Sequence, residues 1–355
     1  MHIAIPREIK SNEGRVALIP AACRDLVSQG HEVYVQSGAG AACGYSDPDY
    51  QDAGAVIVSD AKDTWARGEL ILKVKEPQAS EYPYLNANQI LFCFLHLVTL
   101  PELTQVLKDA GITAIGFETV QTHDGALPIL TPMSEIAGRL AVQIGTTLLH
   151  APNGGKGILL GGLPGADRGS VVIIGAGNAG AHAAQVAATL GARVTVFDLR
   201  QDRLERLHNL APNITTHYPW SAKIEQAVAS ADLLVGAVLV AGRRAPQVIS
   251  EAQVKSMQVG SVIVDISIDQ GGCVATSRPV SYANPTYNRH GIVHFSVTNM
   301  PGGVPRTASQ CLSAALTPYV MRLAAKDWQA DLALSAAVNI SAGRIQHPAL
   351  KEEYK

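Results

Sequence analysis

The chain has few cysteines, and their arrangement indicates neither a cross-link nor a metal. Its 355 residues include five cysteines, at positions 23, 43, 93, 273 and 311, and no C-x-x-C pair. An odd, scattered set argues against a disulfide framework and a zinc site, and it is typical of a reducing compartment. We therefore expect no metal ion and a cytoplasmic location.

Long charged runs and long apolar runs are also missing. The net charge is −2 and no Lys/Arg run stands out, which argues against nucleic acid or an anionic membrane as a partner. No apolar run approaches the roughly 20 residues that cross a bilayer. Arg7, Glu8 and Lys10 follow the first residues too closely for a signal peptide. H-E-x-x-H, G-x-S-x-G and P-loop motifs are absent as well.

A dinucleotide-binding fingerprint occupies the middle of the chain. The β-branched run 171–174 predicts a buried parallel strand, and 179–190 predicts an Ala-rich helix. Glycines in G-x-G-x-x-G spacing allow a tight turn, close approach of a pyrophosphate, and close packing of helix on strand. The helix N-terminus attracts the phosphates. We therefore expect the dinucleotide to bind at Gly175, Ala176, Gly177, Asn178, Ala179 and Gly180.

An acidic residue completes this fingerprint. Asp198 ends the next expected strand, 194–197, about 20 residues beyond the glycines, where a carboxylate takes the ribose hydroxyls of NAD. The same carboxylate would repel the 2′-phosphate of NADP, so the pattern favours NAD. Arg200 and Arg203 follow closely, and an arginine there can bind that phosphate, which leaves NADP open.

The first part of the chain alternates between strand and helix patterns. Such alternation predicts a parallel sheet with helices on both faces, here without a glycine fingerprint of its own. Segment 38–49 has the composition of a loop. Helices are expected at 20–29 and 102–110, and strands at 2–5, 31–36, 56–58, 70–74, 90–95 and 112–118.

The second part reads as a full dinucleotide-binding domain. A long helix begins at 131, a Gly-rich loop fills 151–169, and a helix at 307–325, interrupted by Pro318, leads into a helical C-terminal remainder. The six expected strands are 171–174, 194–197, 213–217, 232–238, 261–266 and 293–297. We expect an α/β protein of two doubly wound Rossmann-like domains with a cleft between them and C-terminal helices returning to the first. The first would comprise 1–130 and 307–355, and the second 131–306.

Three polar residues of the first domain stand where an open α/β sheet binds ligands, beyond the carboxyl ends of strands. Arg15 lies in the loop after the first strand, and its guanidinium suits a substrate carboxylate. Lys75 ends the strand 70–74. His96 follows 90–95 and can exchange protons near neutral pH. Each could instead have a purely structural place. Arg15 could be a surface arginine, Lys75 a solvated strand end, and His96 a core histidine.

Two further candidates belong to the second domain. Asp269 follows the fifth strand, on the nicotinamide side of such a fold, and Asn299 follows the sixth. Asp265 lies inside the strand pattern and is expected to be structural. The Pro and Gly residues after Asn299 suit a hinge.

Collinear motifs over essentially the whole chain resemble the alanine dehydrogenase family, which also includes the transhydrogenase α-subunits. They are far more specific than the glycine fingerprint. The motifs are Pro6–Lys10, Asn12-Glu13, Arg15–Ala17, Lys73–Pro77, Leu95–Leu97, Leu130–Gly138, Gly161-Gly162, Gly236–Val240, Val264–Ile266, Asp269–Gly272 and Asn299–Gly302.

This resemblance implies reversible, NAD-dependent oxidation of L-alanine to pyruvate and ammonia, in a homohexamer. It implies that Arg15, Lys75 and Asn299 hold the substrate, that His96 is the general acid/base, and that Asp269 assists proton transfer. It also implies further NAD contacts at Ser134, Arg203, Leu239, Ile266, Asp269, Val297, Asn299 and Met300.

Some positions depart from the family pattern, and two other functions remain open. Phe94 stands where the family often has Tyr, Gly14 where an aromatic residue is common, and Gly303 where Ala is usual. The first two put the choice of alanine over glycine or serine in question. The alternatives are the nucleotide-binding part of a proton-translocating transhydrogenase and a non-catalytic NAD-binding module. NAD-dependent turnover of alanine separates all three.

Overall fold

The computed structural model describes residues 1–240, 244–325 and 327–354, which form two structural units. The first unit contains Met1–Met133 and the chain from Gly302 onward, and the second contains Ser134–Val240 and Arg244–Pro301. Residues 241–243, 326 and 355, which belong to the predicted domain ranges, lie outside the described residues.

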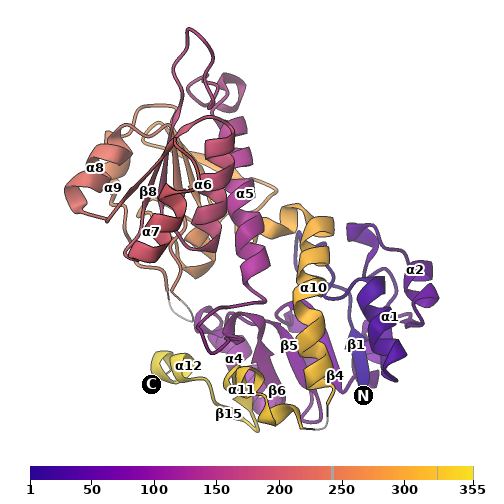
Figure 1. Ribbon diagram of the computed structural model, residues 1–355. Coiled ribbons are helices and arrows are strands. Elements are labelled where there is room, and N and C mark those ends of the chain that lie inside the picture. The colour runs from indigo at the N-terminus through magenta and orange to yellow at the C-terminus, as the bar shows by residue number, and fades with distance from the viewer. Residues whose placement is uncertain (241–243, 326, 355) are drawn as a thin grey trace. The chain divides into compact units, whose positions relative to one another are not determined.

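The first unit is built on an eight-stranded sheet with the order β15-β14-β6-β5-β4-β1-β2-β3 (Figure 1). The six strands β1 to β6 are parallel to one another, as the alternation of patterns predicts. Their bounds are His2–Ile5, Glu32–Gln36, Val56–Val58, Leu70–Lys75, Ile90–Phe94 and Thr113–Gly116. The α-helices of this unit are α1 (Pro20–Ser28), α2 (Asp47–Asp52), α3 (Ala61–Arg67), α4 (Pro101–Ala110), α10 (Pro305–Leu323), α11 (Leu332–Ala336) and α12 (Pro348–Glu353).

Two expectations for the first unit are wrong. The segment 38–49 is not only loop: α2 begins inside it, because Ser46 and Asp49 form a reciprocal capping box. The C-terminal remainder is not wholly helical, since β14 (Val338–Ser341) and β15 (Arg344–Ile345) extend the sheet antiparallel beyond β6. These strands are too short to show alternation. β14 pairs backbone groups that the edge of β6 would otherwise leave open, and β15 pairs with β14.

The second unit has a seven-stranded sheet with the order β12-β13-β11-β10-β7-β8-β9. Its strands β7 to β11 and β13 have the strand order of a dinucleotide-binding fold, and they confirm the six expected strands. The antiparallel β12 was not predicted. Strand bounds are Ser170–Ile174, Arg193–Phe197, Ile214–His217, Leu233–Gly236, Val262–Asp265, Thr286–Arg289 and Ile292–Phe295 for β7 to β13, and helix bounds are α5 (Thr131–Leu148), α6 (Asn178–Thr189), α7 (Gln201–His208), α8 (Ser221–Ala229) and α9 (Glu251–Ser256).

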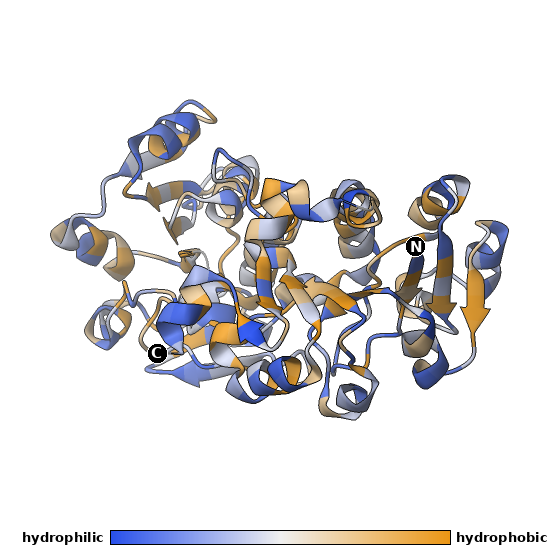
Figure 2. Cartoon of the chain, turned by 90° about the horizontal axis from the view of Figure 1, so that it is seen from below, coloured by the Kyte–Doolittle hydropathy of each residue, from blue (hydrophilic) through white to orange (hydrophobic). Residues whose placement is uncertain are grey.

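Alternate residues of β7 pack into two different apolar layers. Val171 and Ile173 join the small buried alanines of α6 on one face of the sheet. Val172 and Ile174 join Ile224 and other residues of α8 and α9 on the other face. Helices therefore cover both faces, and Figure 2 shows them carrying both hydrophobic and hydrophilic residues. Each such fully buried branched side chain stabilises the fold by roughly 1.5–3 kcal/mol.

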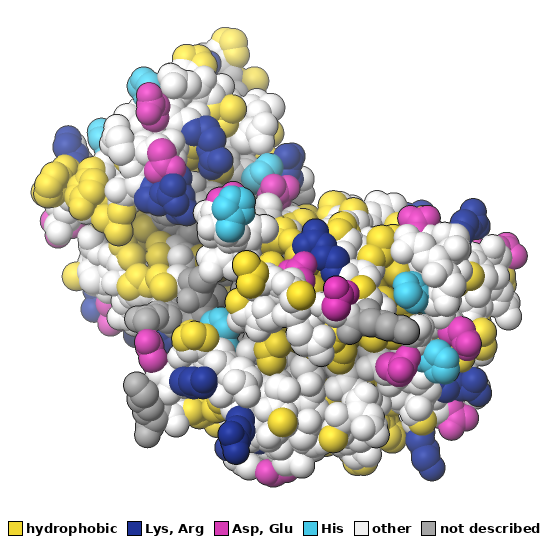
Figure 3. All heavy atoms as spheres, turned by 60° about the horizontal axis from the view of Figure 1, so that its bottom comes forward, with side chains coloured by type: hydrophobic (Ala, Val, Ile, Leu, Met, Phe, Trp, Pro, Cys, Tyr) yellow, Lys and Arg dark blue, Asp and Glu magenta, His cyan; other side chains and the backbone are white. Residues whose placement is uncertain are grey.

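The surface carries charges of both signs. On the face drawn in Figure 3, basic and acidic side chains are interspersed rather than gathered into a patch of one sign. Across the described residues, the helices are too short or too polar to span a bilayer.

Candidate functional site

The glycine-rich turn of the second unit lies between β7 and α6. Gly175 has φ of 102°, which favours glycine, and its N–H donates to the Phe197 carbonyl at 2.8 Å. A Cβ on Gly180 would lie 1.7 Å from the Gly175 carbonyl oxygen. A Cβ on Gly177 would instead meet only the Arg203 Nη1 atom, at 3.7 Å. The turn is therefore closed at Gly180 and open at Gly177, where a pyrophosphate would need room.

Alanine substitutions should separate these two roles. Gly180→Ala forces the helix away from the turn, so we expect it to destabilise the protein by more than about 3 kcal/mol. Gly177→Ala should leave the melting temperature nearly unchanged but weaken NADH binding, because the methyl group occupies open space. Thermal unfolding and NADH fluorescence titration measure the two effects. Equal loss of stability in both variants would contradict this assignment.

Asp198 is tied to the turn and to the start of α7. Its Oδ2 accepts the Ala176 N–H at 2.6 Å and its Oδ1 accepts the Arg200 N–H at 2.8 Å. Arg203 Nη1 lies 3.6 Å from the carboxylate, whereas the Arg200 guanidinium faces away toward Asp202, at 2.6 and 3.0 Å. The carboxylate thus stands at the end of β8 beside the glycines, as the fingerprint requires.

Two candidates of the second unit lie together beyond neighbouring strands. Asp269 is in the 3₁₀ turn η6 (Ile266–Gln270) after β11, and Asn299 follows β13 with φ of 62°. The backbone N–H of Asn299 donates to both carboxylate oxygens of Asp269, at 3.1 and 3.2 Å. This contact fixes the carboxylate at the carboxyl edge of the sheet.

A buried network that the motifs did not reveal supports the Asp269 turn. Asp265 is fully buried and accepts the N–H groups of Ser267, Cys273 and Val274 at 3.0–3.1 Å. Burial raises the pKa of this carboxyl, and hydrogen bonds oppose the rise. The Ser267 hydroxyl donates to the Val238 carbonyl at 2.8 Å and accepts the Val238 N–H at 3.0 Å. Asp265 is therefore structural, as expected, and Ser267 joins the loops that follow β10 and β11.

The other cofactor candidates of this unit differ in exposure. Leu239, after β10, is 49% exposed, and Ser134 and Ile266 are half-buried. The side chains of Ala176, Val297 and Met300 lie in the hydrophobic core. These three could therefore reach a cofactor only through their backbone atoms.

Arg15 in the first unit is held by an acidic residue that the motif analysis gave no role. Glu13 accepts Arg15 Nε at 2.7 Å and Nη2 at 2.5 Å, and it accepts the Arg15 backbone N–H at 3.0 Å. Arg15 Nη1 lies 3.2 Å from the Met133 sulfur, and Arg15 is 2% exposed. Burial acts to raise the pKa of Glu13, but the Arg15 guanidinium outweighs it and lowers that pKa to about 2. Glu13 and Arg15 lie only two positions apart, so their pairing could have been predicted from the sequence.

The lowered pKa of Glu13 predicts acid sensitivity. An ionised carboxylate that is paired only in the folded state stabilises the protein above its unfolded pKa, near 4.5. That contribution is lost as the pH falls from about 4.5 toward about 2. Glu13→Gln should therefore lower the melting temperature at pH 7 and flatten its dependence on pH in that window. An unchanged pH dependence in the variant would rule out this role for Glu13.

Lys75 and His96 end neighbouring parallel strands, so they stand at the same edge of the sheet. Lys75 is the last residue of β4 and is 5% exposed, and His96 follows β5. The half-buried His96 ring stacks on Phe94, with ring centroids 5.8 Å apart and planes 6° from parallel. Burial, followed by the positive charges of Lys75, Lys10 and Arg15, holds the pKa of His96 well below its usual range. A neutral imidazole of this kind can accept a proton at neutral pH.

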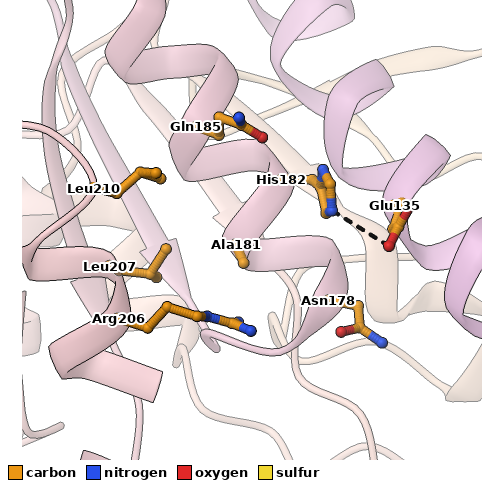
Figure 4. A pocket seen from close by; sticks show the side chains of 8 residues that line it. All are labelled: Glu135, Asn178, Ala181, His182, Gln185, Arg206, Leu207 and Leu210. Carbon is orange, nitrogen blue, oxygen red and sulfur yellow. Dashed lines mark ion pairs between the residues drawn. The ribbon is translucent and has the colours of Figure 1, made fainter. Parts of the chain in front are cut away.

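In the second unit, a pocket of about 220 Å³ is lined by residues of α5, α6 and α7 (Figure 4). His182 and Glu135 form an ion pair across it, with Nε2 and Oε1 3.5 Å apart. Of the sequence-predicted site residues, only Asn178 lines this pocket. As far as the described residues go, no cluster of three or more His, Cys, Asp and Glu is placed to hold a metal ion.

Comparison with known proteins agrees with the fold. The family model "Alanine dehydrogenase/PNT, N-terminal domain" matches residues 4–137, and "Alanine dehydrogenase/PNT, C-terminal domain" matches residues 141–348. The alanine dehydrogenase of Mycolicibacterium smegmatis is 46% identical, with 99% of this chain and 96% of that protein covered. The alanine dehydrogenase of Bacillus subtilis is 47% identical, with 99% of this chain and 94% of that protein covered.

Solved structures extend the likeness to three dimensions. A structure named L-alanine dehydrogenase superposes with a TM-score of 0.95 at 48% identity, covering 100% of this chain and 99% of that one. A transhydrogenase from Sinorhizobium meliloti shares the fold, with a TM-score of 0.82 at 24% identity, covering 98% of this chain and all of the other. The fold and the matches define the chain as an enzyme, an amino-acid oxidoreductase. It belongs to the alanine dehydrogenase/PNT family.

Proposed function

We propose that this enzyme is an NAD-dependent L-alanine dehydrogenase, which converts L-alanine, NAD⁺ and water reversibly into pyruvate, ammonium, NADH and a proton. The observation that carries the proposal is the position of His96 and its lowered pKa. This histidine stands at a sheet edge with a lowered pKa, beside Lys75 and Arg15, which are suited to hold a carboxylate and a carbonyl oxygen. The names of the relatives support the choice of alanine.

Substrate binding falls to Arg15, Lys75 and Asn299. The Arg15 guanidinium would pair with the substrate carboxylate, and its orientation is fixed by Glu13. Lys75 would hold the oxygen that becomes the pyruvate carbonyl. Fixing the carboxylate also orients the hydrogen on the substrate Cα, which contributes to the rate through proximity.

His96 and Asp269 would carry out the proton transfers. His96 takes a proton from the alanine ammonium group, since only a neutral amine can be oxidised. Bound NAD supplies the acceptor for the hydride that leaves Cα. Asp269 stabilises the positive iminium carbon–nitrogen group and positions the attacking water. His96 then returns a proton to the departing amine.

We assign NAD binding to the second unit and substrate binding to the first, with domain limits at 1–130 with 307–355, and 131–306. The cofactor residues are Ser134, Gly175, Ala176, Gly177, Asn178, Ala179, Gly180, Asp198, Arg203, Leu239, Ile266, Asp269, Val297, Asn299 and Met300. The position of Asp198 beside the glycine turn supports NAD over NADP, and so does the pairing of Arg200 with Asp202. We further propose a cytoplasmic homohexamer active in alanine catabolism.

Oxidation of NADH by pyruvate plus ammonium tests this function. We expect activity only when both are present, and much less with NADPH. Omitting ammonium distinguishes this reaction from reduction of pyruvate to a hydroxy acid. NADH that binds without turnover would indicate a binding module, and hydride transfer between two nucleotides would indicate a transhydrogenase.

A further inference from the structure

Glu118 makes hydrogen bonds that no motif assigns to it. It lies in the 3₁₀ turn η4 (Phe117–Thr119), directly after β6. Its Oε1 accepts the backbone N–H of His96 at 2.7 Å, and both carboxylate oxygens accept the N–H of Leu95 at 3.2 Å. One carboxylate therefore receives two successive backbone N–H groups, an arrangement that suits an anion.

These contacts begin where the pairing of β5 with β6 ends. The last paired residues of the two strands are Cys93 and Gly116. Beyond them, the N–H groups of Leu95 and His96 have no strand partner in that register, and the Glu118 side chain supplies an acceptor instead. Buried N–H groups need such acceptors, since leaving one unpaired costs roughly 1–3 kcal/mol.

His96 also has a backbone conformation that needs support. Its φ and ψ are 48° and 36°, in the left-handed region that non-glycine residues seldom adopt. Such conformations cost of the order of 1–3 kcal/mol and persist only where surrounding contacts fix them. Glu118 accepts the N–H of this very residue.

We propose that Glu118 is the positioning residue for His96. Its carboxylate fixes the left-handed turn, and the turn sets the direction in which the imidazole leaves the backbone and rests on the Phe94 ring. Without Glu118, the imidazole would spend less time in reach of the substrate amine, although it would remain chemically intact. The inference rests on the proposed acid–base role of His96.

The electrostatics of Glu118 agree with this role. Burial raises the pKa of its carboxyl, while the N–H groups of Glu118 itself, His96 and Leu95 and the charge of Lys75 oppose the rise. The carboxylate is therefore stabilised by backbone N–H donors more than by the charge of Lys75. Among described residues, no ion pair joins Glu118 to a basic side chain within 4.0 Å.

Two substitutions and a double-mutant cycle test the proposal. Glu118→Ala removes both acceptors, and we expect kcat to fall roughly 30–100-fold with the KM values for pyruvate and NADH nearly unchanged. Glu118→Gln keeps one acceptor oxygen and should lose only about tenfold, which keeps the test valid if the alanine variant fails to fold. In a His96→Ala background, adding Glu118→Ala should change the residual rate by less than about twofold.

Glu81→Gln is the matched control, because Glu81 is a buried carboxylate of the same unit. Its partner is Lys73, at 3.0 Å, and not His96. This variant should lose stability but keep kcat. A full additional loss from Glu118→Ala in the His96→Ala background would overturn the proposal, as would an unchanged kcat in both Glu118 variants. If His96→Ala alone kept its rate, the acid–base role itself would fail, which is a distinguishable result.

Discussion

Replacing His96 by alanine is expected to lower kcat for alanine oxidation by roughly 100-fold or more, the usual contribution of a general acid/base. The ammonium proton of alanine then has no neutral imidazole to receive it. The KM for NAD should change little, because His96 belongs to the first unit and the glycine turn to the second. Steady-state rates with each substrate varied in turn measure this split.

The control for this substitution is His31→Ala, a histidine of the same unit between α1 and β2. It should keep kcat within about twofold. Because the pKa of His96 lies well below its usual range, the wild-type rate should not fall on acidification from pH 8 through about 6.5. A wild-type rate that already falls in that range would contradict the lowered pKa of His96. A His96→Ala variant of normal rate would remove His96 from the proton transfer.

Asp269→Asn should produce the second large effect, again a loss of roughly 100-fold in kcat. In the wild-type chain the Asn299 N–H lies 3.1 Å from the carboxylate. The amide of the variant keeps an oxygen that can accept this N–H, so the loop after β13 should stay in place. Only the negative charge is lost. That charge is what stabilises the iminium group and orients the water, so kcat should fall while NADH still binds.

Asp269→Ala is the companion variant. It removes both the charge and the acceptor, and leaves the Asn299 N–H without its present partner. We expect the same loss of kcat as in Asp269→Asn, together with weaker NADH binding because Asn299 and Met300 are no longer fixed. If Asp269→Asn were fully active and Asp269→Ala inactive, Asp269 would act only by holding this loop.

The sheet of the second unit was predictable because its signals are local. The strand β7, the glycine turn and α6 follow one another directly, and the spacing of glycines, apolar residues and Asp198 carries the information. The strand-end rule also placed Asp269 and Asn299 at one edge, where a hydrogen bond joins them although they are 30 residues apart. The short β14 and β15 lacked a local pattern, and the pairing of β14 with β6 and of β15 with β14 depends on the folded sheet.

Supporting residues of the site were harder to predict. Glu118 is 22 residues from His96, and Ser267 is 29 residues from Val238. Neither spacing is a helical or strand period, so no local pattern links the members of each pair. Only the order of neighbouring strands, β5 beside β6 and β10 beside β11, brings them together. Candidate catalytic residues could therefore be identified from the sequence, whereas these long-range contacts that orient them could not.

Transfer of deuterium from L-[2-²H]alanine tests the proposed reaction most directly. The deuterium on Cα should appear in the reduced nicotinamide, one atom for each pyruvate formed, because hydride passes directly from Cα to NAD. Mass spectrometry of the nucleotide measures it. Reduced nucleotide without deuterium, or no reduced nucleotide although NAD binds, would contradict a direct hydride transfer from alanine.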